Sequence, residues 1–136
     1  MRGKKSKGVS LLEVLIAIAI IAALAIYAYP KYTRYVTKTR RLDGQVALLE
    51  LATELNEYHA QHKTYKGASL MRLDIPEISP EGYYKLTIKE ATNNTYLIEA
   101  SPLKSQAKDD TECGSYTYNQ AGDKTVTGTS TVAECW

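Results

Sequence analysis

An apolar run from Val9 to Tyr29 constrains this chain more than any other feature of its sequence. About 20 apolar residues are enough for a helix to span a bilayer. A basic segment that ends at Gly8 comes directly before the run, as the positive-inside rule expects of a membrane segment. The only charge within the run is Glu13. Because a carboxylate inside a membrane segment is costly and usually marks a functional position, the sequence predicts a membrane helix with a functional glutamate.

A secretory signal peptide is the ordinary alternative for a chain that begins this way. Its cleavage site would follow Ala23-Leu24-Ala25. Its basic residues would be Arg2, Lys4, Lys5 and Lys7. Glu13 argues against this alternative, because the apolar region of a signal peptide is normally uncharged, and the helical pattern continues far beyond the cleavage site. A plain single-pass anchor is a second alternative, and it is compatible with any protein that rests in the membrane before use.

The chain is 136 residues long, so only about 75 residues remain for a globular head after a leader and a long helix. A domain of that size buries a modest core and often needs a covalent staple. Its two cysteines, Cys113 and Cys135, allow one intramolecular pairing, which an exported domain would form as a disulfide. Two cysteines without close spacing make a poor zinc site.

Basic residues are concentrated in one short stretch rather than spread over the chain. The formal net charge is +2, but residues 1–8 carry four positive charges and no negative ones, so a chain without them has a net charge of −2. The basic stretch directly follows the apolar run and consists of Lys31, Arg34, Lys38, Arg40 and Arg41. Such a stretch can bind lipid or nucleic-acid phosphates. Its position favours a role at the membrane surface or in a subunit contact over nucleic-acid binding.

The segment 9–61 is predicted to form one long helix, with residues 9–29 as its apolar part. Pro30 removes one backbone hydrogen bond and predicts a bend. Downstream, apolar residues recur every three or four positions, which predicts a stripe that packs on the head. The stripe consists of Leu42, Val46, Leu49, Leu48, Leu51, Ala52, Leu55 and Tyr58. Asp43 lies off the stripe and is expected in solvent, and Gly44 is expected to weaken the helix locally.

The segment 62–136 is predicted to be the globular head, with a connecting loop over 62–82. Alternation of apolar and polar residues predicts strands at 83–89 and 95–101, joined at Asn93-Asn94. Two further strands, at 115–119 and 124–127, form a second hairpin. A long helix followed by antiparallel strands predicts the α+β class, with the helix packed on a small antiparallel sheet.

The N-terminal pattern resembles that of the type IV pilin family. Gly8 matches the residue before the prepilin-peptidase cleavage site, and Val9 would become the N-methylated first residue. Glu13 matches the glutamate at the fifth mature position, and Pro30 matches the proline that kinks the pilin helix. Residues 1–8 would then be the leader. The chain departs from most members in starting its mature part with valine rather than phenylalanine.

The small head, the short hairpin over 83–101 and the ending at Cys135-Trp136 resemble the minor pilins of the twitching-pilus type. The resemblance implies a pilin fold, with Cys113 and Cys135 bracketing a disulfide-bonded C-terminal loop. It implies a structural subunit that supports pilus assembly or initiation, and hence twitching motility, adhesion or DNA uptake. The implied partners are major and minor pilins, prepilin peptidase, the inner-membrane assembly platform and, before assembly, membrane lipid. The implied location is the bacterial inner membrane with the head in the periplasm, followed by the pilus at the cell surface.

The resemblance also suggests a role for Glu13. When apolar helices pack in a filament, a buried carboxylate needs a partner, and the amino group of Val9 in a neighbouring subunit is the natural one. Removing one member of a buried pair can cost about 3–5 kcal/mol. A subunit docked out of register would bury Glu13 unpaired, so Glu13 is expected to favour the correct register between subunits.

Two alternatives to a minor pilin remain open. One is a pseudopilin of a type II secretion system, which usually has calcium-binding acids rather than a C-terminal disulfide. The other is an anchored module whose head binds a surface or DNA, with Lys124 and the loop 101–113 as contacts.

Other candidate sites are weaker. His59 and His62 are spaced to share a metal, but a solvated helix face explains them better. The acidic cluster of Asp109, Asp110 and Glu112 could bind calcium, but an exposed loop is the simpler explanation. Asn93-Asn94-Thr95 matches a glycosylation sequon that the turn already explains. The sequence predicts no catalytic residue, no metal site and no cofactor.

Overall fold

The protein is described here from a computed structural model, which describes residue 3 and residues 7–136. Arg2, Lys4 and Lys5 of the expected leader lie outside the described residues. The chain divides into two units, Met1–Val36 and Thr37–Trp136, each of which is considered by itself. The second unit contains the sheet and is called the head below.

The first element is a long helix, α1 (Leu11–His62), which belongs to both units. Its last turn is followed by Lys63, whose positive φ of 60° ends the helical path. Pro30 lies inside the helix. The bend expected at Pro30 stays a prediction.

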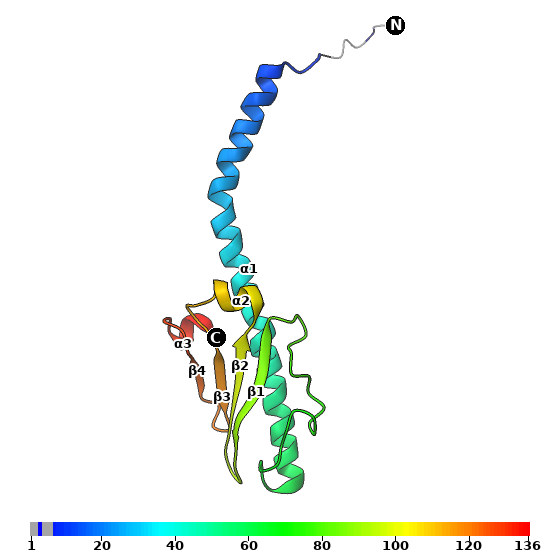
Figure 1. Cartoon of the computed structure of the whole chain (residues 1–136), viewed down its shortest axis with the longest axis vertical. Helices are drawn as coiled ribbons and strands as arrows, with labels where there is room; N and C mark the ends of the chain where they lie inside the picture. The colour runs from blue at the N-terminus through cyan, green and yellow to red at the C-terminus, as the bar shows by residue number, and fades with distance from the viewer. Residues whose placement is uncertain (1–2, 4–6) are drawn as a thin grey trace. The chain divides into compact units, whose positions relative to one another are not determined.

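Four antiparallel strands form one sheet in the order β1-β2-β3-β4 (Figure 1). Their bounds are β1 (Tyr84–Ala91), β2 (Tyr96–Pro102), β3 (Tyr116–Asn119) and β4 (Lys124–Val126). Each strand pairs with the one before it, with Leu86 opposite Ala100 and Ile98 opposite Tyr118. The predicted α+β class, a long N-terminal helix with a small antiparallel sheet, is confirmed.

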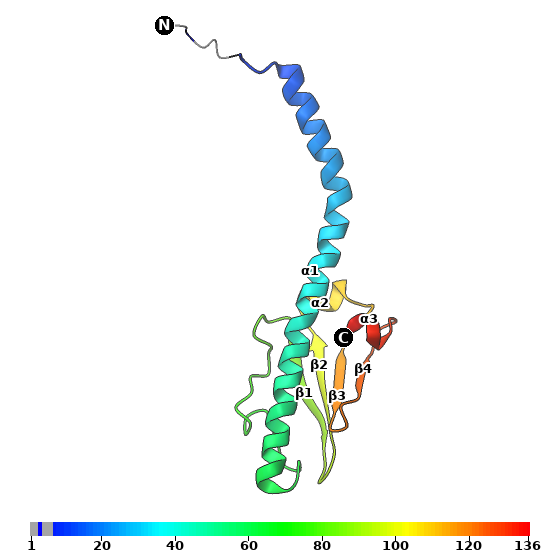
Figure 2. The same ribbon diagram turned by 180° about the vertical axis from the view of Figure 1, so that it is seen from behind.

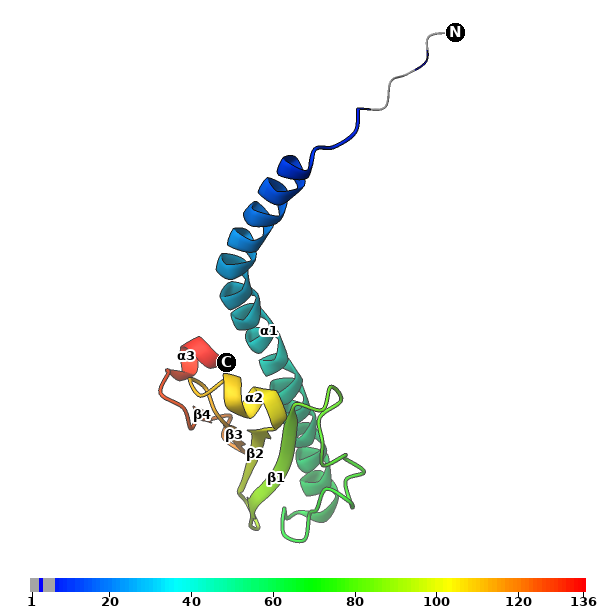
Figure 3. The same ribbon diagram turned by 45° about the horizontal axis from the view of Figure 1, so that its top comes forward.

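The core of the head lies between α1 and one face of the sheet, which Figure 2 shows from the helix side. Leu48, Leu51 and Leu55 of α1 are fully buried. The sheet contributes alternate residues, so that Tyr84, Leu86, Tyr96, Ile98, Ala100 and Tyr116 point into the core. A short helix, α2 (Lys104–Asp109), lies at one end of the sheet, and α3 (Val132–Cys135) lies beside β4 (Figure 3).

The prediction that the whole apolar stripe of α1 packs on the head is wrong for its first half. Leu42, Val46 and Leu49 are 58%, 59% and 40% exposed, whereas the second half of the stripe is largely buried. At 100° per residue, Val46 of the first row and Leu48 of the second differ by about 200° around the helix. The two rows therefore lie on opposite faces of α1, and only one of them can face the sheet.

Gly44 has a packing role that the sequence did not show. A Cβ atom at this position would lie 2.6 Å from Cγ of Tyr84, too close for any side chain. The residue is buried within continuous helix. Instead of loosening the helix, Gly44 lets the ring of Tyr84 approach the α1 backbone.

Candidate functional site

The residues around the predicted cleavage site are exposed and come before the first turn of α1. Gly8 and Val9 are both exposed, and nothing lies within 4 Å of the place where a Cβ atom would sit at Gly8. Ser10 caps the helix, because its Oγ accepts a hydrogen bond from the backbone N–H of Glu13 at 3.2 Å. The fold thus gives no packing reason for glycine at position 8.

Glu13 lies in the first turn of α1, where a carboxylate interacts favourably with the helix dipole. The helix contains an 18-residue window with a mean hydropathy of 2.7, and none of that window is buried within the chain. By length and composition the helix could span a membrane. An apolar surface of this extent requires an apolar environment, either lipid or other protein.

Side chains of α1 make local contacts around Pro30. Lys31 Nζ donates to the hydroxyl of Tyr27 at 2.8 Å and lies 4.4 Å from the centre of the same ring. Thr33 Oγ1 donates to the carbonyl of Tyr29 at 3.0 Å. These contacts use an amphipathic lysine and tyrosines at the point where the apolar run ends, which is typical of residues at a membrane interface.

The basic stretch divides into two parts with different roles. Lys31, Arg34 and Lys38 are exposed. Arg40 is half-buried, where its guanidinium donates to Ser105 Oγ at 3.0 Å and lies 4.3 Å from the centre of the Tyr83 ring. Arg41 is buried. The predicted membrane or subunit role is therefore wrong for Arg41, whose charge is used inside the head.

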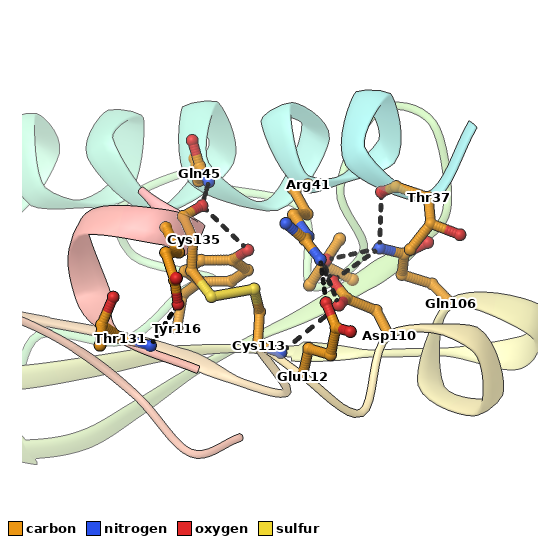
Figure 4. A network of polar contacts seen from close by, with 12 residues as sticks. Thr37, Arg41, Gln45, Gln106, Asp110, Glu112, Cys113, Tyr116, Thr131 and Cys135 are labelled. Atoms are coloured by element: carbon orange, nitrogen blue, oxygen red, sulfur yellow. Dashed lines mark hydrogen bonds and ion pairs between the residues drawn. A yellow bond between two sulfur atoms is a disulfide. The ribbon is translucent and has the colours of Figure 1, made fainter. Parts of the chain in front are cut away.

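Arg41 and Asp110 form a buried ion pair at the centre of a polar network (Figure 4). Arg41 Nε and Nη2 each donate to one carboxylate oxygen of Asp110 at 2.8 Å. The two side chains are 9% and 0% exposed. The hydrogen bond with Asp110 raises the pKa of Arg41 above its usual value. Two parallel charge-assisted bonds fix the segment after α2 against α1.

Gln106 extends the network to the helix and the sheet (Figure 4). It is fully buried, and the two N–H groups of its Nε2 are shared among three acceptors, the carbonyl of Thr37, Tyr84 Oη and Asp110 Oδ2, at 3.1, 3.0 and 3.2 Å. Burial raises the pKa of Tyr84, so its hydroxyl stays protonated. Gln106 Nε2 thus joins α1, β1 and the segment after α2, whereas the buried Oε1 of the same side chain has no hydrogen-bond partner among the described residues.

A disulfide joins Cys113 to Cys135, with 22 residues of sequence separation and a Cα–Cα distance of 5.7 Å (Figure 4). Both cysteines are buried. The carbonyl of Cys135 accepts hydrogen bonds from Gln45 Nε2 at 2.6 Å and from Tyr116 Oη at 3.2 Å. The looped segment is therefore held by α1 and β3 as well as by the covalent bond.

The outer end of this segment carries an aromatic and a basic side chain. The ring of Trp136 lies edge-on to Tyr116 with a centroid distance of 5.3 Å. Lys124 Nζ lies 4.8 Å from the centre of the Trp136 ring. Lys124 is exposed, so its ammonium group faces solvent above an aromatic surface.

Two family models match consecutive parts of the chain. The Prokaryotic N-terminal methylation motif matches residues 3–29, and the model described as "Type IV minor pilin ComP, DNA uptake sequence receptor" matches residues 30–117. The second match covers more than half of the chain. The chain belongs to the type IV minor pilin family. The resemblance seen in the sequence is thus confirmed, and the match favours a pilin over a type II secretion pseudopilin.

The fold agrees with this assignment. The pilin is similar to the crystal structure of the Neisseria meningitidis non-core minor pilin PilV, with a TM-score of 0.56 and 19% identity. That similarity covers 69% of this chain and 89% of the other. No curated protein sequence matches the chain. The disulfide expected for a pilin of this type is present, whereas the processing and assembly roles of Gly8, Val9, Glu13 and Pro30 stay predictions.

Asp43 of the pilin is buried, not solvated as the sequence predicted. Its carboxylate accepts hydrogen bonds from Ser79 Oγ and from the backbone N–H groups of Glu81 and Tyr83 at 3.0 and 3.3 Å. Asp43 therefore anchors the turn before β1 to α1. The helical pattern alone could not reveal this, because the donors come from a distant segment.

The acidic cluster of the pilin is not an exposed loop throughout. Asp110 is buried against Arg41, whereas Glu112 is exposed with a carboxylate oxygen 3.8 Å from Arg41 Nη2. His59 and His62 stack on Tyr65 and Tyr58, with centroid distances of 4.4 and 4.1 Å. Within the part of the chain that the structure describes, no group of three or more histidine, cysteine or acidic side chains is placed to hold a metal ion.

Proposed function

We propose that this minor pilin is a filament subunit whose head binds DNA. The observation that carries the proposal is the extent of the family match. It covers residues 30–117, so it includes most of the head, and the family's description names a DNA uptake sequence receptor. The chain would be cleaved between Gly8 and Val9 by prepilin peptidase, N-methylated at Val9 and then assembled with other pilins.

Before assembly, residues 9–29 would hold the protein in the inner membrane with the head, residues 62–136 and the end of α1, in the periplasm. The exposed apolar surface of this part of α1 supports that proposal. The inner-membrane assembly platform would then move the helix from lipid into contact with other pilins. The assembled filament would carry the subunit to the cell surface. The intact mass and N-terminal sequence of protein from its native membrane test the first step. A first residue of N-methyl-valine supports it, and an uncut chain or a start at Ile26 contradicts it.

Glu13 would pair with the amino group of Val9 in a neighbouring subunit. Its exposed place in the first turn of α1 leaves its carboxylate accessible to a partner. Pro30 would set the path of the helix where the apolar run ends. We expect Glu13→Ala to be cleaved normally but to enter filaments poorly, which immunoblotting of sheared filaments and membranes measures. Normal entry of this variant would contradict the role of Glu13.

DNA binding would use local positive charge, since the chain without residues 1–8 has a net charge of −2. Several exposed lysine and arginine side chains of the head have no ion pair within the described residues. They are Lys63, Lys66, Arg72, Lys104, Lys108 and Lys124. Lys124 over Trp136 places a cation beside an aromatic ring, a combination suited to phosphate contact together with base or sugar contact.

Fluorescence anisotropy of a labelled DNA duplex tests this part of the proposal, with the full chain in detergent micelles. We expect binding that weakens as salt rises, because phosphate contacts release counterions. Lys124→Ala should weaken binding, and Lys89→Ala is the matched control, because it removes an exposed lysine on β1 that is already paired with Glu99 at 3.4 Å. Absence of binding at about 50 mM salt, where phosphate contacts are strongest, would contradict DNA recognition while leaving the pilus subunit role untouched.

A further inference from the structure

We infer that the outer edge of β1 binds an extended, acidic segment of another protein, which adds a strand to the sheet. The site covers residues 86–91. It lies at the edge of the sheet opposite β4, the strand that begins with Lys124 (Figure 1). It is therefore separate from the Lys124 contact proposed for DNA and from the apolar part of α1, and it depends on neither DNA binding nor filament assembly.

Backbone groups at this edge point away from the sheet. The N–H of Leu86 donates outward, to the carbonyl of Glu77 in the segment before β1, at 2.7 Å. Since the direction of the hydrogen bonds alternates along a strand, the N–H and C=O groups of Ile88 face outward as well. Among the described residues, Ile88 has no hydrogen-bond partner outside the sheet.

A β-bulge at Lys89 leaves the end of the strand open in the same way. Beyond the bulge, Ala91 lies opposite Tyr96. The N–H of Tyr96 donates to Gln120, in the turn after β3, at 3.2 Å and so points away from β1. The pair of Ala91 and Tyr96 is therefore not hydrogen-bonded, and the N–H and C=O groups of Ala91 also point outward. Outward groups in a row are a template for another strand.

A groove runs along this open edge. Its volume is about 640 Å³, and it lies between β1 and the segment of residues 67–71. On β1 it is lined from Lys85 to Ala91, about 20 Å of strand, which accommodates about six extended residues. Leu70 and Ile88 give it a partly apolar lining. An added strand would place alternate side chains against such a lining.

Glu77 of the chain itself shows what the edge accepts. Its carbonyl accepts the N–H of Leu86, and its carboxylate lies 3.0 Å from Lys85 Nζ. An acidic residue is thus held there by its main chain and by its side chain together. On the N-terminal side of Glu77 the chain leaves the edge, because the N–H of Ile75 donates to the carbonyl of Leu70 instead. The rest of the groove is open to a separate segment.

Charge around the groove favours an acidic partner. The cations that line or flank it outnumber the acids, and the two sets are Lys66, Arg72, Lys85 and Lys89 against Glu77 and Glu90. The ion pair of Lys89 with Glu99, at 3.4 Å, lies at the surface, where such pairs contribute little to stability. An incoming carboxylate can therefore replace Glu99 as the partner of Lys89.

A second copy of the chain and DNA are poorer occupants. A second copy would bring its own edge lysines and its own bulge, and both features oppose the pairing of identical edges. DNA would meet the outward carbonyl groups of Ile88 and Ala91, which repel phosphate oxygens. An extended protein segment uses the N–H and the C=O groups alike.

Amide hydrogen exchange of the full chain in detergent micelles, followed by NMR, tests the inference. The probe is the synthetic peptide acetyl-Glu-Val-Glu-Val-Glu-Val-amide. We expect the amides of Ile88 and Ala91 to exchange at least about tenfold more slowly with saturating peptide, because they gain hydrogen-bond partners. The amide of Leu86 is the internal control, because Glu77 already accepts its hydrogen bond.

Two control peptides separate strand addition from other binding. One has lysine in place of each glutamate, and the other has a methyl group on every backbone nitrogen, so that it keeps the side chains but cannot donate. Neither should slow the exchange. Unchanged exchange with the acidic peptide overturns the inference, as does equal slowing by either control peptide or by a DNA duplex.

A charge reversal locates the site. We expect Lys89→Glu to weaken binding of the acidic peptide by about threefold or more, the order expected when a surface ion pair becomes a repulsion. Lys124→Glu, at the opposite edge of the sheet, is the matched control and should leave binding unchanged. The unfolding midpoint, followed by the fluorescence of Trp136, shows that each variant is folded. Equal binding by the two folded variants overturns the inference.

Discussion

Replacing Arg41 by methionine tests directly how much the buried ion pair with Asp110 contributes to the stability of the head. Methionine fills much of the space of the arginine side chain but leaves the buried Asp110 without its ion-pair partner. Asp110 keeps two weaker contacts, from Gln106 Nε2 at 3.2 Å and from the backbone N–H of Cys113 at 3.4 Å. Breaking a buried pair from one side costs about 3–5 kcal/mol. This loss is a large part of the total stability of about 5–15 kcal/mol that is usual for a domain.

Trp136 is the only tryptophan and packs edge-on against Tyr116, so its fluorescence reports unfolding of the head. Urea denaturation of the full chain in detergent micelles then gives the free energy of unfolding. With a dependence of about 2 kcal/mol per molar urea, the midpoint of Arg41→Met should fall by about 2 M. The double variant Arg41→Met with Asp110→Leu removes both charges, and should lose only about 1–2 kcal/mol through its missing hydrogen bonds.

The comparison between these two variants decides whether the reasoning holds. If Arg41→Met lowers the free energy of unfolding by less than about 1 kcal/mol, the variant does not leave Asp110 as an uncompensated charge in a dry interior. If the double variant is less stable than Arg41→Met, the loss comes from packing rather than from the unpaired carboxylate. Either result would refute the account of Arg41 and Asp110 given above.

Three further perturbations act on other parts of the head. Cys113→Ser opens the disulfide loop and should lower the free energy of unfolding by about 3 kcal/mol, measured in urea with the unaltered chain under reductant as the control. Gly44→Ala should lower the melting temperature although alanine favours helix, because its Cβ would overlap the Tyr84 ring; a higher melting temperature would contradict this. Burial raises the pKa of Tyr96 and of Tyr116 to about 12. Stability should therefore be complete below pH 10 and fall between pH 10 and 12, as the unfolded state loses protons first, and a flat profile would contradict it.

The strands and the long helix could be predicted because each depends on a short stretch of sequence. Alternation over Tyr84, Leu86 and Ile88 identifies β1, and Asn93-Asn94 identifies the turn that follows it. The position of the disulfide also followed from the sequence, since only two cysteines are present. Predicting these features does not require knowing which distant residues pack against them in the core.

The roles of individual polar residues could not be predicted, because their partners are distant in the sequence. Arg41 and Asp110 are 69 residues apart, and Asp43 binds groups that follow it by 36 to 40 residues. The burial of Leu42, Val46 and Leu49 was wrongly predicted for a related reason. The periodicity of α1 contains two apolar rows, and only the packing of the sheet shows which of them is covered.

The order of the strands has a consequence for how the head folds. Each strand from β2 to β4 pairs with the strand that precedes it, through tight turns at 92–95 and 120–123 and through the longer connection 103–115, which contains α2. Contacts of this local kind favour rapid folding. The sheet can therefore form one strand at a time, beginning at β1, as the chain would emerge into the periplasm in the order of its sequence. The acceptor for Gln45 and Tyr116 is the carbonyl of Cys135, which lies beyond all four strands. Because Cys135 follows all four strands in the sequence, we expect the disulfide to close last, after the sheet has formed.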